Sequence, residues 1–582
     1  MKRYNPTDIE QKWQATWERD GTYVVDLHDQ TKPKYLGFSM LPGITGAGIH
    51  TGHGRTFQFS DIKVRAKRQQ GYNAYHPIGW DSFGLPVENY AIKIGKKPRV
   101  AHDEAKANFI KQLKRLGYSY DWTKEISTAD PQYYRWTQWI FNQLLKNDLA
   151  YQKESPQWWC ETDQTVLANE QVEGGKCWRC GNPVVKKNLK QWFFKITAYA
   201  DEMLDATDDL NWTDMVKTMQ KNWIGKSQGA EIEFSIDGHD DTLTVFSTRP
   251  DTIFGATFLV LAPEHDLAKA LANSDTRETV EVYIADAARK SEIERMNDTR
   301  EKTGVFTGSH AINPATGQKI PIWIADYVLA GYGTGAVMAV PAHDERDFAF
   351  AEKYNLSIVD VVEKPDNDSE VGLYSGEGPL VNSGHFDGMQ SSEAREEVVA
   401  WLEQEGVGRS KVTYKMRDWL ISRQRYWGAP IPVVHTADHG TIAIADELLP
   451  VVLPDIDDYK PKGGATSVLA TVEDWVHVWI NTQTTETVSY SAGKPTGDNW
   501  VEGHRETDTM DGYACSSWYF IRYIDPFNDK QAWDPELAKQ WQPVDFYNGG
   551  DHAVAHLLYS RFWMRFFYKL GLVPDPEPFK RM

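Results

Sequence analysis

The chain has 582 residues, of which 41% are hydrophobic and 25% charged, an ordinary globular composition that excludes wholesale disorder and fibrous repeats. Its formal net charge of -19 argues against a general nucleic-acid coat, although a local basic face can still contact RNA. Four cysteines exclude a disulfide-rich secreted scaffold, and no apolar run reaches the roughly 18 residues of a membrane span. These properties predict a multi-domain cytoplasmic protein without a membrane partner.

The first predicted elements are a strand, a glycine-rich loop and a helix. Before them, Asn5 and Pro6 begin a peripheral helix, as its N-cap and first helical residue. The apolar run 35–41 (YLGFSML) is suited to a buried parallel strand, and residues 42–48 (PGITGAG) break it. A helix then begins near His50. This layout presents backbone N–H groups and a positive helix end to a phosphate group.

Two histidines stand at the start of that helix, in the sequence HTGH. His50 and His53 are three residues apart and therefore lie on one helical face. Placed over a triphosphate, they can donate hydrogen bonds to oxygens whose charge grows during attack at the α-phosphorus. Gly52 between them lets a nucleotide approach the backbone. Taken alone, the motif favours a structural pair of histidines.

The rest of the chain alternates between α/β and β-rich stretches. Residues 60–150 predict an α/β region with helices near 102–117 and 132–149. The β-rich stretch from about 228 to 410 is long enough to be an inserted domain, and a second α/β region follows it. Residues 455–503 are polar and rich in glycine and threonine, and they predict a surface insertion.

A small cysteine-containing knuckle precedes the β-rich stretch. Cys160-x2-Asp163 followed by Cys177-x2-Cys180 has the spacing of a zinc ribbon in which Asp163 replaces one cysteine. Three thiolates and a carboxylate can bind Zn²⁺, and a metal-free knuckle held by packing is the alternative. Cys515 is distant in the sequence and is expected to be a buried apolar residue.

Further motifs give the chain a family resemblance. Residues 40–53 (MLPGITGAGIHTGH), 79–88 (GWDSFGLPVE) and 422–428 (SRQRYWG) resemble signatures of the class I aminoacyl-tRNA synthetases, specifically the bacterial-type leucyl-tRNA synthetases. Other matches are TRPDT at 248–252, AHDERD at 342–347, RDW at 417–419, RETDTMD at 505–511 and SSWY at 516–519. The isoleucine and valine relatives differ at the GWDxFGLP and TRPDT positions, so the resemblance favours leucine. It runs almost from end to end.

The resemblance implies an α/β fold. A class I, Rossmann-like, parallel-sheet catalytic domain would carry an inserted β-rich editing domain and a small zinc-ribbon-like knuckle. The expected segments are the first half of the catalytic domain (1–152), the zinc-ribbon-like insertion (153–190), a connection (191–227), the editing domain (228–412) and the second half of the catalytic domain (413–582), with the surface insertion at about 455–503.

The resemblance also implies ATP-dependent activation of leucine and its attachment to tRNA(Leu). His50 and His53 would stabilise the transition state of adenylation, and Asp81 would hold the ammonium of leucine. The ATP-binding residues would be Gly46, Gly48, His50, Gly52 and His53, and the leucine side chain would contact Met40, Leu41, His552 and His556. No general base is needed because the carboxylate of leucine is already ionised, so catalysis would rest on positioning and charge stabilisation with Mg²⁺.

The inserted domain resembles the family's proofreading domain. Binding alone rejects a smaller aliphatic side chain by only roughly 10–200-fold, so a second, hydrolytic pocket is needed. Asp344 would anchor the amino group of a mischarged amino acid, and Thr252 would block leucine sterically. The expected editing residues are Thr248, Arg249, Asp251, Thr252, His343 and Asp344.

The sequence also departs from the family pattern. Gly43 and Ile44 stand where the family has Tyr and Pro, and the loop GGDHA at 549–553 is one residue shorter than its counterpart. Neither a KMSKS-like segment nor the C-terminal tRNA-binding helical bundle is recognisable. We therefore expect the chain to adenylate poorly by itself and to work with a C-terminal part, supplied by a second synthetase subunit carrying KMSKS or by a longer gene product.

Two other functions stay open at this point. An editing-only hydrolase of mischarged aminoacyl-tRNA would use the inserted domain but would not need His50, His53 and Asp81. A non-catalytic RNA-binding relic is suggested only by Gly43 and the shortened GGDHA loop. Leucine-dependent ATP–pyrophosphate exchange separates the synthetase from both alternatives, and hydrolysis of mischarged tRNA separates the hydrolase from the relic.

Overall fold

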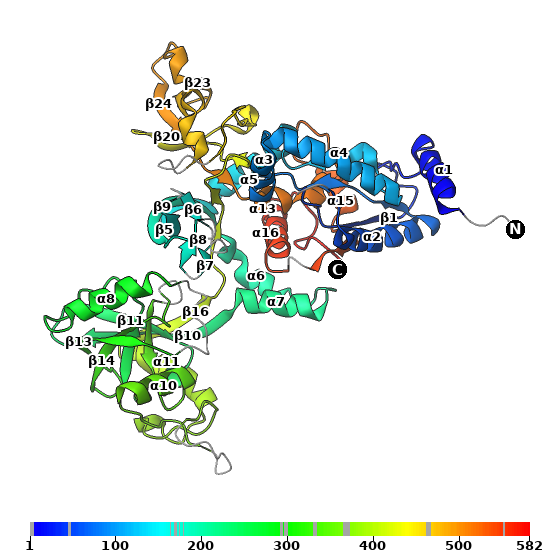
Figure 1. Cartoon of the computed structure of the whole chain (residues 1–582). Helices are drawn as coiled ribbons and strands as arrows, with labels where there is room; N and C mark the ends of the chain where they lie inside the picture. The colour runs from blue at the N-terminus through cyan, green and yellow to red at the C-terminus, as the bar shows by residue number, and fades with distance from the viewer. Residues whose placement is uncertain are drawn as a thin grey trace. The chain divides into compact units, whose positions relative to one another are not determined.

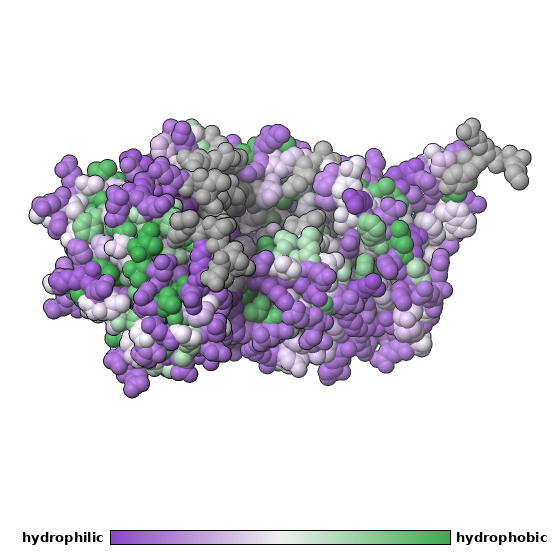
Figure 2. Space-filling view, turned by 90° about the horizontal axis from the view of Figure 1, so that it is seen from below, coloured by the Kyte–Doolittle hydropathy of each residue, from purple (hydrophilic) through white to green (hydrophobic). Residues whose placement is uncertain are grey.

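Two compact units divide the chain in the computed structural model. The first comprises Met1–Ser155, Asn188–Ile224 and Met416–Met582, and the second comprises Pro156–Lys187 and Gly225–Lys415. Within the part that the structure describes, no helix is long and apolar enough to cross a membrane. Figure 2 shows a mostly hydrophilic face on which hydrophobic groups form small patches, as is usual for globular proteins. The described residues are 5–44, 48–162, 165–167, 172–173, 175–177, 180–290, 295, 301–329, 334–364, 373–460, 467–550 and 553–582.

Parallel strands form the centre of the first unit (Figure 1). β1 (Lys34–Ser39) pairs in parallel with β2 (Asn73–Tyr75) on one side and with β26 (Phe546–Asn548) on the other. β3 (Gly79–Trp80) pairs in parallel with β4 (Ile126–Ser127). Parallel neighbours need long crossover connections, and helices supply them here. This arrangement confirms the predicted α/β fold with a parallel sheet.

Helix α2 (Thr51–Gln69) connects β1 to β2 and buries Phe57 and Val64. The helices predicted near 102–117 and 132–149 correspond to α4 (Pro98–Leu116) and α5 (Pro131–Lys146). Each of these two begins at a proline, a residue that suits the first helical position because its missing N–H needs no partner there. Other helices of this unit are α1 (Pro6–Arg19), α3 (Leu85–Ile94), α6 (Ala200–Asp205), α7 (Asp214–Ile224), α13 (Gly512–Ser516), α14 (Tyr519–Arg522), α15 (Pro535–Trp541) and α16 (His556–Lys569).

A five-stranded antiparallel sheet forms a separate layer of the first unit, in the order β21-β20-β24-β22-β23. It includes the segment expected as a surface insertion, in which alternate residues of the chain, such as Val478 and Ile480, are buried in a small apolar core. Its elements are β20 (Val433–Thr436), β21 (Gly440–Ala443), α12 (Glu473–Val476), β22 (His477–Asn481), β23 (Thr487–Ser489) and β24 (Trp500–Arg505). Further strands are β5 (Ala150–Cys160), β9 (Val185–Phe194), β17 (Trp419–Leu420), β18 (Ser422–Arg423), β19 (Ala429–Pro430) and β25 (Thr509–Met510).

The second unit is built on a seven-stranded sheet in the order β11-β10-β13-β14-β12-β15, with β16 paired to β10. Its pairs are antiparallel except for β12 and β14, and apolar side chains such as Ile232, Phe234 and Leu259 form its core. The sequence predicts this β-rich stretch; β10 alternates buried and more exposed residues, whereas β12 is a continuous apolar run. The elements are β10 (Lys226–Ile236), β11 (Thr242–Ser247), β12 (Phe258–Leu261), α8 (Arg277–Ala287), β13 (Gly304–Ile312), β14 (Lys319–Ala325), β15 (Ala336–Ala339), α10 (Glu345–Tyr354), α11 (Ser391–Gln404) and β16 (Gly408–Tyr414), with β6 (Thr165–Leu167), β7 (Val172–Glu173) and β8 (Lys176–Cys177) in the knuckle.

Candidate functional site

The start of α2 holds the two predicted histidines in a reciprocal cap. His50 is the N-cap residue, and its Nδ1 accepts the backbone N–H of His53 at 3.3 Å, while Nδ1 of His53 accepts the backbone N–H of His50 at 3.4 Å. The rings stack with centroids 3.7 Å apart. Because each Nδ1 is an acceptor, the proton of each neutral ring lies on Nε2. Two Nε2–H donors therefore stand at a helix N-terminus, where anions bind favourably.

The side chains around this histidine pair explain why glycine stands at positions 48 and 52. A Cβ on Gly52 would lie 2.9 Å from atoms of the His50 ring, so a side chain there would disrupt the stack. A Cβ on Gly48 would meet the amide of Gln112 at 2.5 Å, and Gln112 also accepts the N–H of Ile49 at 2.7 Å. Burial, together with the neighbouring His50, lowers the pKa of His53, which keeps this ring neutral at pH 7.

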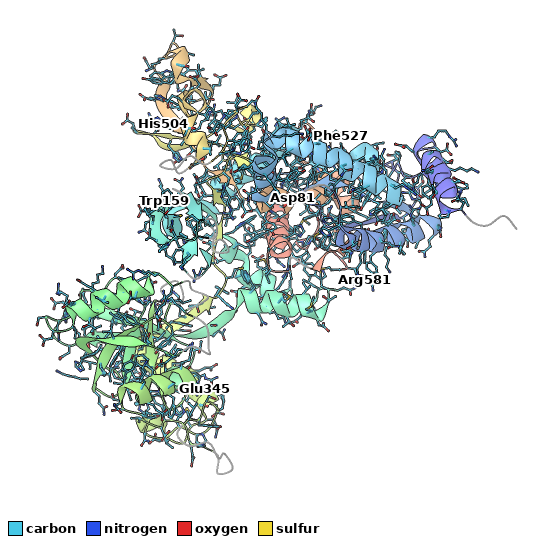
Figure 3. All side chains as sticks on the ribbon, viewed as in Figure 1. Asp81, Trp159, Glu345, His504, Phe527 and Arg581 are labelled. Carbon is cyan, nitrogen blue, oxygen red and sulfur yellow. The ribbon has the colours of Figure 1, made fainter. Side chains whose placement is uncertain are left out.

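Asp81 lies directly after β3, where Asp81 N donates to Pro42 O at 3.0 Å and Ile44 N donates to Asp81 O at 3.2 Å. Its Oδ1 is buried and has no hydrogen-bond partner. Burial raises the pKa of Asp81 to about 7; a hydrogen bond from Ser516 opposes this rise, and the charge of Asp511 adds to it. Asp81 is thus a half-buried residue with one buried carboxylate oxygen that has no hydrogen-bond partner, and Figure 3 labels it within the first unit.

The other predicted leucine contacts lie at the same edge of the parallel strands. Met40 follows β1 and donates its N–H to the carbonyl of Asn548, the last residue of β26. Leu41 is buried beside Gly79, whose added Cβ would lie 2.9 Å from the Leu41 side chain. His556 is buried at the start of α16. Ligands of open α/β sheets bind at this carboxyl edge. The predicted residues Gly46 and His552 lie outside the described residues.

Two motifs that are far apart in the sequence pack together behind Asp81. The N–H of Trp427 donates to Oε2 of Glu88 at 2.9 Å, and its indole N–H donates to the carbonyl of Ser82 at 2.6 Å. The carbonyl of Trp427 accepts the N–H of Gly84 at 3.0 Å. The SRQRYWG segment therefore fixes the loop that follows Asp81, so its role here is to position the loop.

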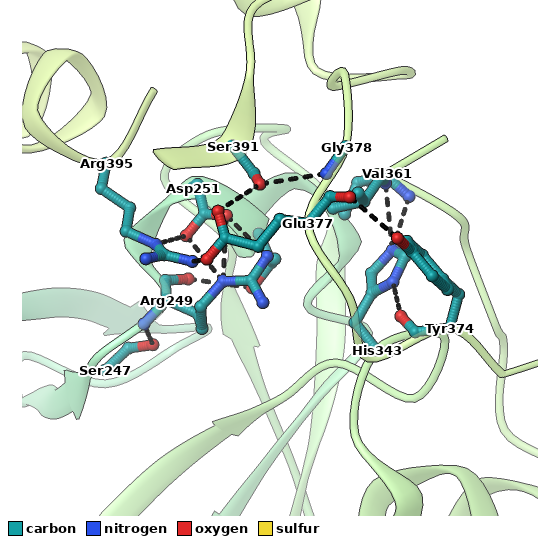
Figure 4. Close-up of polar contacts among 12 residues, drawn as sticks. Ser247, Arg249, Asp251, His343, Val361, Tyr374, Glu377, Gly378, Ser391 and Arg395 are labelled. Carbon is teal, nitrogen blue, oxygen red and sulfur yellow. Dashed lines mark hydrogen bonds and ion pairs between the residues drawn. The ribbon is translucent and has the colours of Figure 1, made fainter. Parts of the chain in front are cut away.

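In the second unit, the TRPDT loop surrounds the carboxylate of Asp251, and both oxygens of this carboxylate accept hydrogen bonds (Figure 4). Asp251 is fully buried, and Arg249 donates to both of its oxygens at 2.8–3.1 Å. Arg395 approaches Asp251 at 3.4 Å and pairs with Glu377 at 2.6 Å. Sequence reasoning missed Arg395 and Glu377, because the segment around Arg395 has the pattern of a solvated helix.

Thr252 and His343 are both buried, but they differ in what their polar atoms do. The Thr252 hydroxyl donates to the carbonyl of Arg249 at 2.9 Å, whereas Thr248 is exposed. Nε2 of His343 accepts the N–H groups of Val361 and Val362 at 2.9 and 3.1 Å. Its Nδ1 therefore carries the proton and donates to the carbonyl of Tyr374 at 2.7 Å. In this geometry His343 ties two loops together and has no free nitrogen for acid–base chemistry.

Two aspartates lie at the start of α10. Asp344 is the N-cap and accepts the N–H groups of Arg346 and Asp347 at 2.9 and 3.2 Å. Asp347 is buried and accepts the N–H of Val340 at 2.9 Å. Burial raises the pKa of Asp347 to about 7, and the charge of Asp344 contributes. Sequence reasoning passed over Asp347, although it stands in the same AHDERD motif.

The knuckle brings its three cysteines together. The sulfur atoms of Cys160, Cys177 and Cys180 all lie within 4.8 Å of one another, and the Sγ atoms of Cys160 and Cys180 are 3.4 Å apart. Three thiols at this spacing fit the donor set of a tetrahedral Zn²⁺ site. The fourth predicted ligand, Asp163, lies outside the described residues.

Comparison with known proteins decides between the functions left open. A family model described as class I tRNA synthetases (I, L, M and V) matches residues 12–232 and 390–495, and one described as the leucyl-tRNA synthetase editing domain matches residues 221–403. The solved agnB2 leucyl-tRNA synthetase of Agrobacterium radiobacter K84 is 35% identical with a TM-score of 0.81, and the match covers 100% of this chain and 67% of that chain. The chain belongs to the class I leucyl-tRNA synthetases.

This membership confirms the leucine–tRNA ligase predicted from the motifs, which activates leucine, charges tRNA and edits mischarged products. Class I synthetases use ATP with Mg²⁺. The family match also makes an editing-only hydrolase an incomplete description, because the class I model matches residues in all three segments of the first unit.

Proposed function

We propose that the loop after β1, the start of α2 and Asp81 form the site where this synthetase joins leucine to AMP. The observation that carries the proposal is the buried Oδ1 of Asp81, which has no partner at the carboxyl edge of the parallel strands. The ammonium of leucine would supply the missing donor and would return the pKa of Asp81 toward its usual range.

In the proposed reaction, a carboxylate oxygen of leucine forms a bond to the α-phosphorus of ATP while the bond to pyrophosphate breaks. No proton moves, because the carboxylate is ionised before attack. The Nε2–H groups of His50 and His53 would donate to phosphate oxygens, and the helix N-terminus would favour the same charge. Mg²⁺, when bound with ATP, would neutralise charge on the phosphates. Gly48 and Gly52 would leave room for the nucleotide, as would the predicted Gly46.

The side chain of leucine would contact Met40, Leu41 and His556 beside Asp81, together with the predicted His552. Leucine would then be transferred to tRNA(Leu). The structure of the relative from Agrobacterium radiobacter, which contains tRNA and LeuAMS, supports this partner. A second subunit carrying KMSKS stays a prediction.

For proofreading, we propose that the TRPDT loop and the start of α10 form the hydrolytic pocket. The buried Thr252 would exclude leucine, and the Arg249–Asp251 pair would hold the loop in shape. Asp344 is our predicted anchor for the amino group. Its capping bonds leave the neighbouring Asp347 as a second candidate, because Asp347 is buried with a raised pKa. Water would cleave the ester between the wrong amino acid and tRNA.

The cysteine cluster supports a further proposal, that Cys160, Cys177 and Cys180 bind Zn²⁺ with Asp163 as the fourth ligand. Metal analysis of the purified chain should find one zinc per chain. The Cys177→Ser variant should lose it, whereas Cys515→Ser should retain it. Equal zinc contents in the two variants would contradict the site.

Leucine-dependent ATP–pyrophosphate exchange tests the activation site, with isoleucine and valine as controls. We expect leucine-specific exchange that increases when a C-terminal synthetase fragment carrying KMSKS is added. Hydrolysis of isoleucyl-tRNA(Leu) by the same preparation tests the editing site. Absence of exchange with and without the fragment would contradict the proposed activation site, whatever the result of the hydrolysis assay.

A further inference from the structure

A pocket of about 650 Å³ lies in the antiparallel sheet that includes β20 to β24, away from the sites described above. Its walls combine apolar and polar groups in similar measure, and the apolar and aromatic ones include Val451, Trp475 and Trp500. Thr487, Glu486 and Arg505 give it polar groups. A cavity of this size suits a ligand as large as one nucleotide.

Arg505, at the end of β24, is the unusual member of this lining. Its Nε is buried and has no hydrogen-bond partner, while one terminal nitrogen donates to the Thr487 hydroxyl at 2.5 Å. The guanidinium lies 5.8 Å from the Trp475 ring centre. Among the described residues, no carboxylate forms an ion pair with Arg505. Burial lowers the pKa of Arg505 to about 10.

Other arginines of the chain have either acidic partners or several backbone acceptors; the buried Arg522, for example, donates to the carbonyls of Ala532 and Asn528. Arg561 and Arg565 share Glu577, and Arg295 pairs with Glu264. Arg505 is half-buried and lines the pocket, and among the described residues its side chain has the Thr487 hydroxyl as its one acceptor, so an anionic ligand in the pocket would supply the acceptors that it lacks. The neighbouring residue His504, labelled in Figure 3, is exposed, and successive strand residues point to opposite faces, so Arg505 lies on the pocket side.

We propose that this pocket binds one unstacked nucleotide of the RNA substrate, with its phosphate on Arg505 and its base against Trp475 or Trp500. Arginine and tryptophan are the side chains that hold single-stranded nucleotides through charge and stacking. Glu486 offers an acceptor to an exocyclic amino group of the base. The inference rests on the proposed function in one respect, that tRNA is the RNA bound.

The test is the affinity of the full chain for a tRNA(Leu) transcript, measured by fluorescence anisotropy over a range of salt concentrations. The Arg505→Gln variant should bind about tenfold more weakly, and the slope of log affinity against log salt should fall by about one. The matched control is Lys494→Gln, which removes one exposed charge from the Trp479 side of the same sheet. The control should change the affinity by less than twofold.

Two further measurements separate a ligand-binding arginine from a structural one. The Tm of Arg505→Gln without RNA should equal or exceed that of the wild type, because the variant removes a half-buried charge that has no acidic partner among the described residues. A lower Tm would assign Arg505 to the fold and overturn the proposal. Leucine-dependent exchange, which needs no RNA, should be unchanged in Arg505→Gln, so failure of this proposal is distinguishable from failure of the activation site.

Other outcomes also contradict the proposal. They are equal losses of affinity in Arg505→Gln and Lys494→Gln, and no tRNA binding by the wild-type chain. Calorimetric titration with uridine monophosphate adds a third arm. Binding of this free nucleotide that depends on Arg505, with tRNA affinity unchanged in the variant, would replace the RNA with a small-molecule ligand.

Discussion

Asp81 in the first unit and Asp251 in the second are both aspartates of signature motifs, yet their carboxylates differ in their hydrogen-bond partners. Asp251 is fully buried and receives hydrogen bonds from Arg249 and an ion pair from Arg395. Asp81 has a buried oxygen without any donor, and burial raises its pKa to about 7. A carboxylate with hydrogen bonds to both oxygens stabilises the loop around it, whereas a carboxylate with an unpaired buried oxygen is able to accept a ligand. The hydrogen bonding of the two aspartates therefore distinguishes a structural role for Asp251 from a proposed binding role for Asp81, although both belong to signature motifs.

The largest effect on activity should come from removing the carboxylate of Asp81. Asp81→Asn should lower leucine-dependent exchange by about a thousandfold, because the leucine ammonium would lose its charged partner in a buried site. Hydrolysis of isoleucyl-tRNA(Leu) should be unchanged in the same preparation. Exchange within tenfold of the wild type would remove Asp81 from its proposed role.

Removing the carboxylate of Asp251 should instead lower the stability of the fold. Asp251→Ala leaves Arg249 without its acidic partner and Arg395 with Glu377 alone, which should cost about 3 kcal/mol of unfolding free energy; the value is at the low end for buried pairs because both arginines are partly exposed. Calorimetry of the whole chain should show one transition at lower temperature, with leucine exchange retained below it. An unchanged thermogram would mean that Asp251 does not act as scaffold.

A smaller effect is expected at the histidine pair. His53→Ala removes one Nε2–H donor and one half of the reciprocal cap, and it should lower kcat of exchange by about a hundredfold. The KM for leucine should change much less, because our proposal assigns the binding of the amino acid to Asp81. A change confined to the KM for leucine would show that His53 binds substrate without stabilising the transition state.

The smallest effect is a pH dependence. In the proposed site the ammonium of leucine pairs with ionised Asp81, and the raised pKa of about 7 means that this carboxyl gains a proton as the pH falls below 7. From pH 8 to pH 6, kcat/KM for leucine should therefore fall about tenfold. Hydrolysis of mischarged tRNA by Asp81→Asn serves as the control for unrelated losses. A flat profile over this range would show that Asp81 is already ionised in the free enzyme.

Much of the fold could be predicted from local sequence. The run 35–41 predicted β1, the glycines after it predicted the loop, and the HTGH motif predicted a helix start that the structure shows as a histidine cap. These features depend on neighbouring residues. The family resemblance supplied the reaction, because several spaced motifs agreed.

The state of each site residue was less predictable, because burial and partners come from distant segments. The raised pKa of Asp81 depends on its desolvation and on Asp511, and the use of both His343 nitrogens depends on loops at Val361 and Tyr374. Arg395 could not be recognised as a partner of Asp251 from the helix that contains it. Which carboxylates are left unsatisfied is thus a property of the tertiary structure.

The central strand β1 has one further consequence, for synthesis of the chain on the ribosome. The N–H of Leu36 donates to Asp545, 509 residues later, and β26 pairs beside the same strand. At a synthesis rate of about 5–20 residues per second, one edge of β1 stays unpaired for roughly 25 to 100 seconds until β26 has been made. During that interval the inserted β-rich unit, whose strands lie within 226–414, is complete and free to fold first. A nascent chain paused before residue 545 should therefore protect the second unit from protease while β1 stays open to cleavage or to a chaperone.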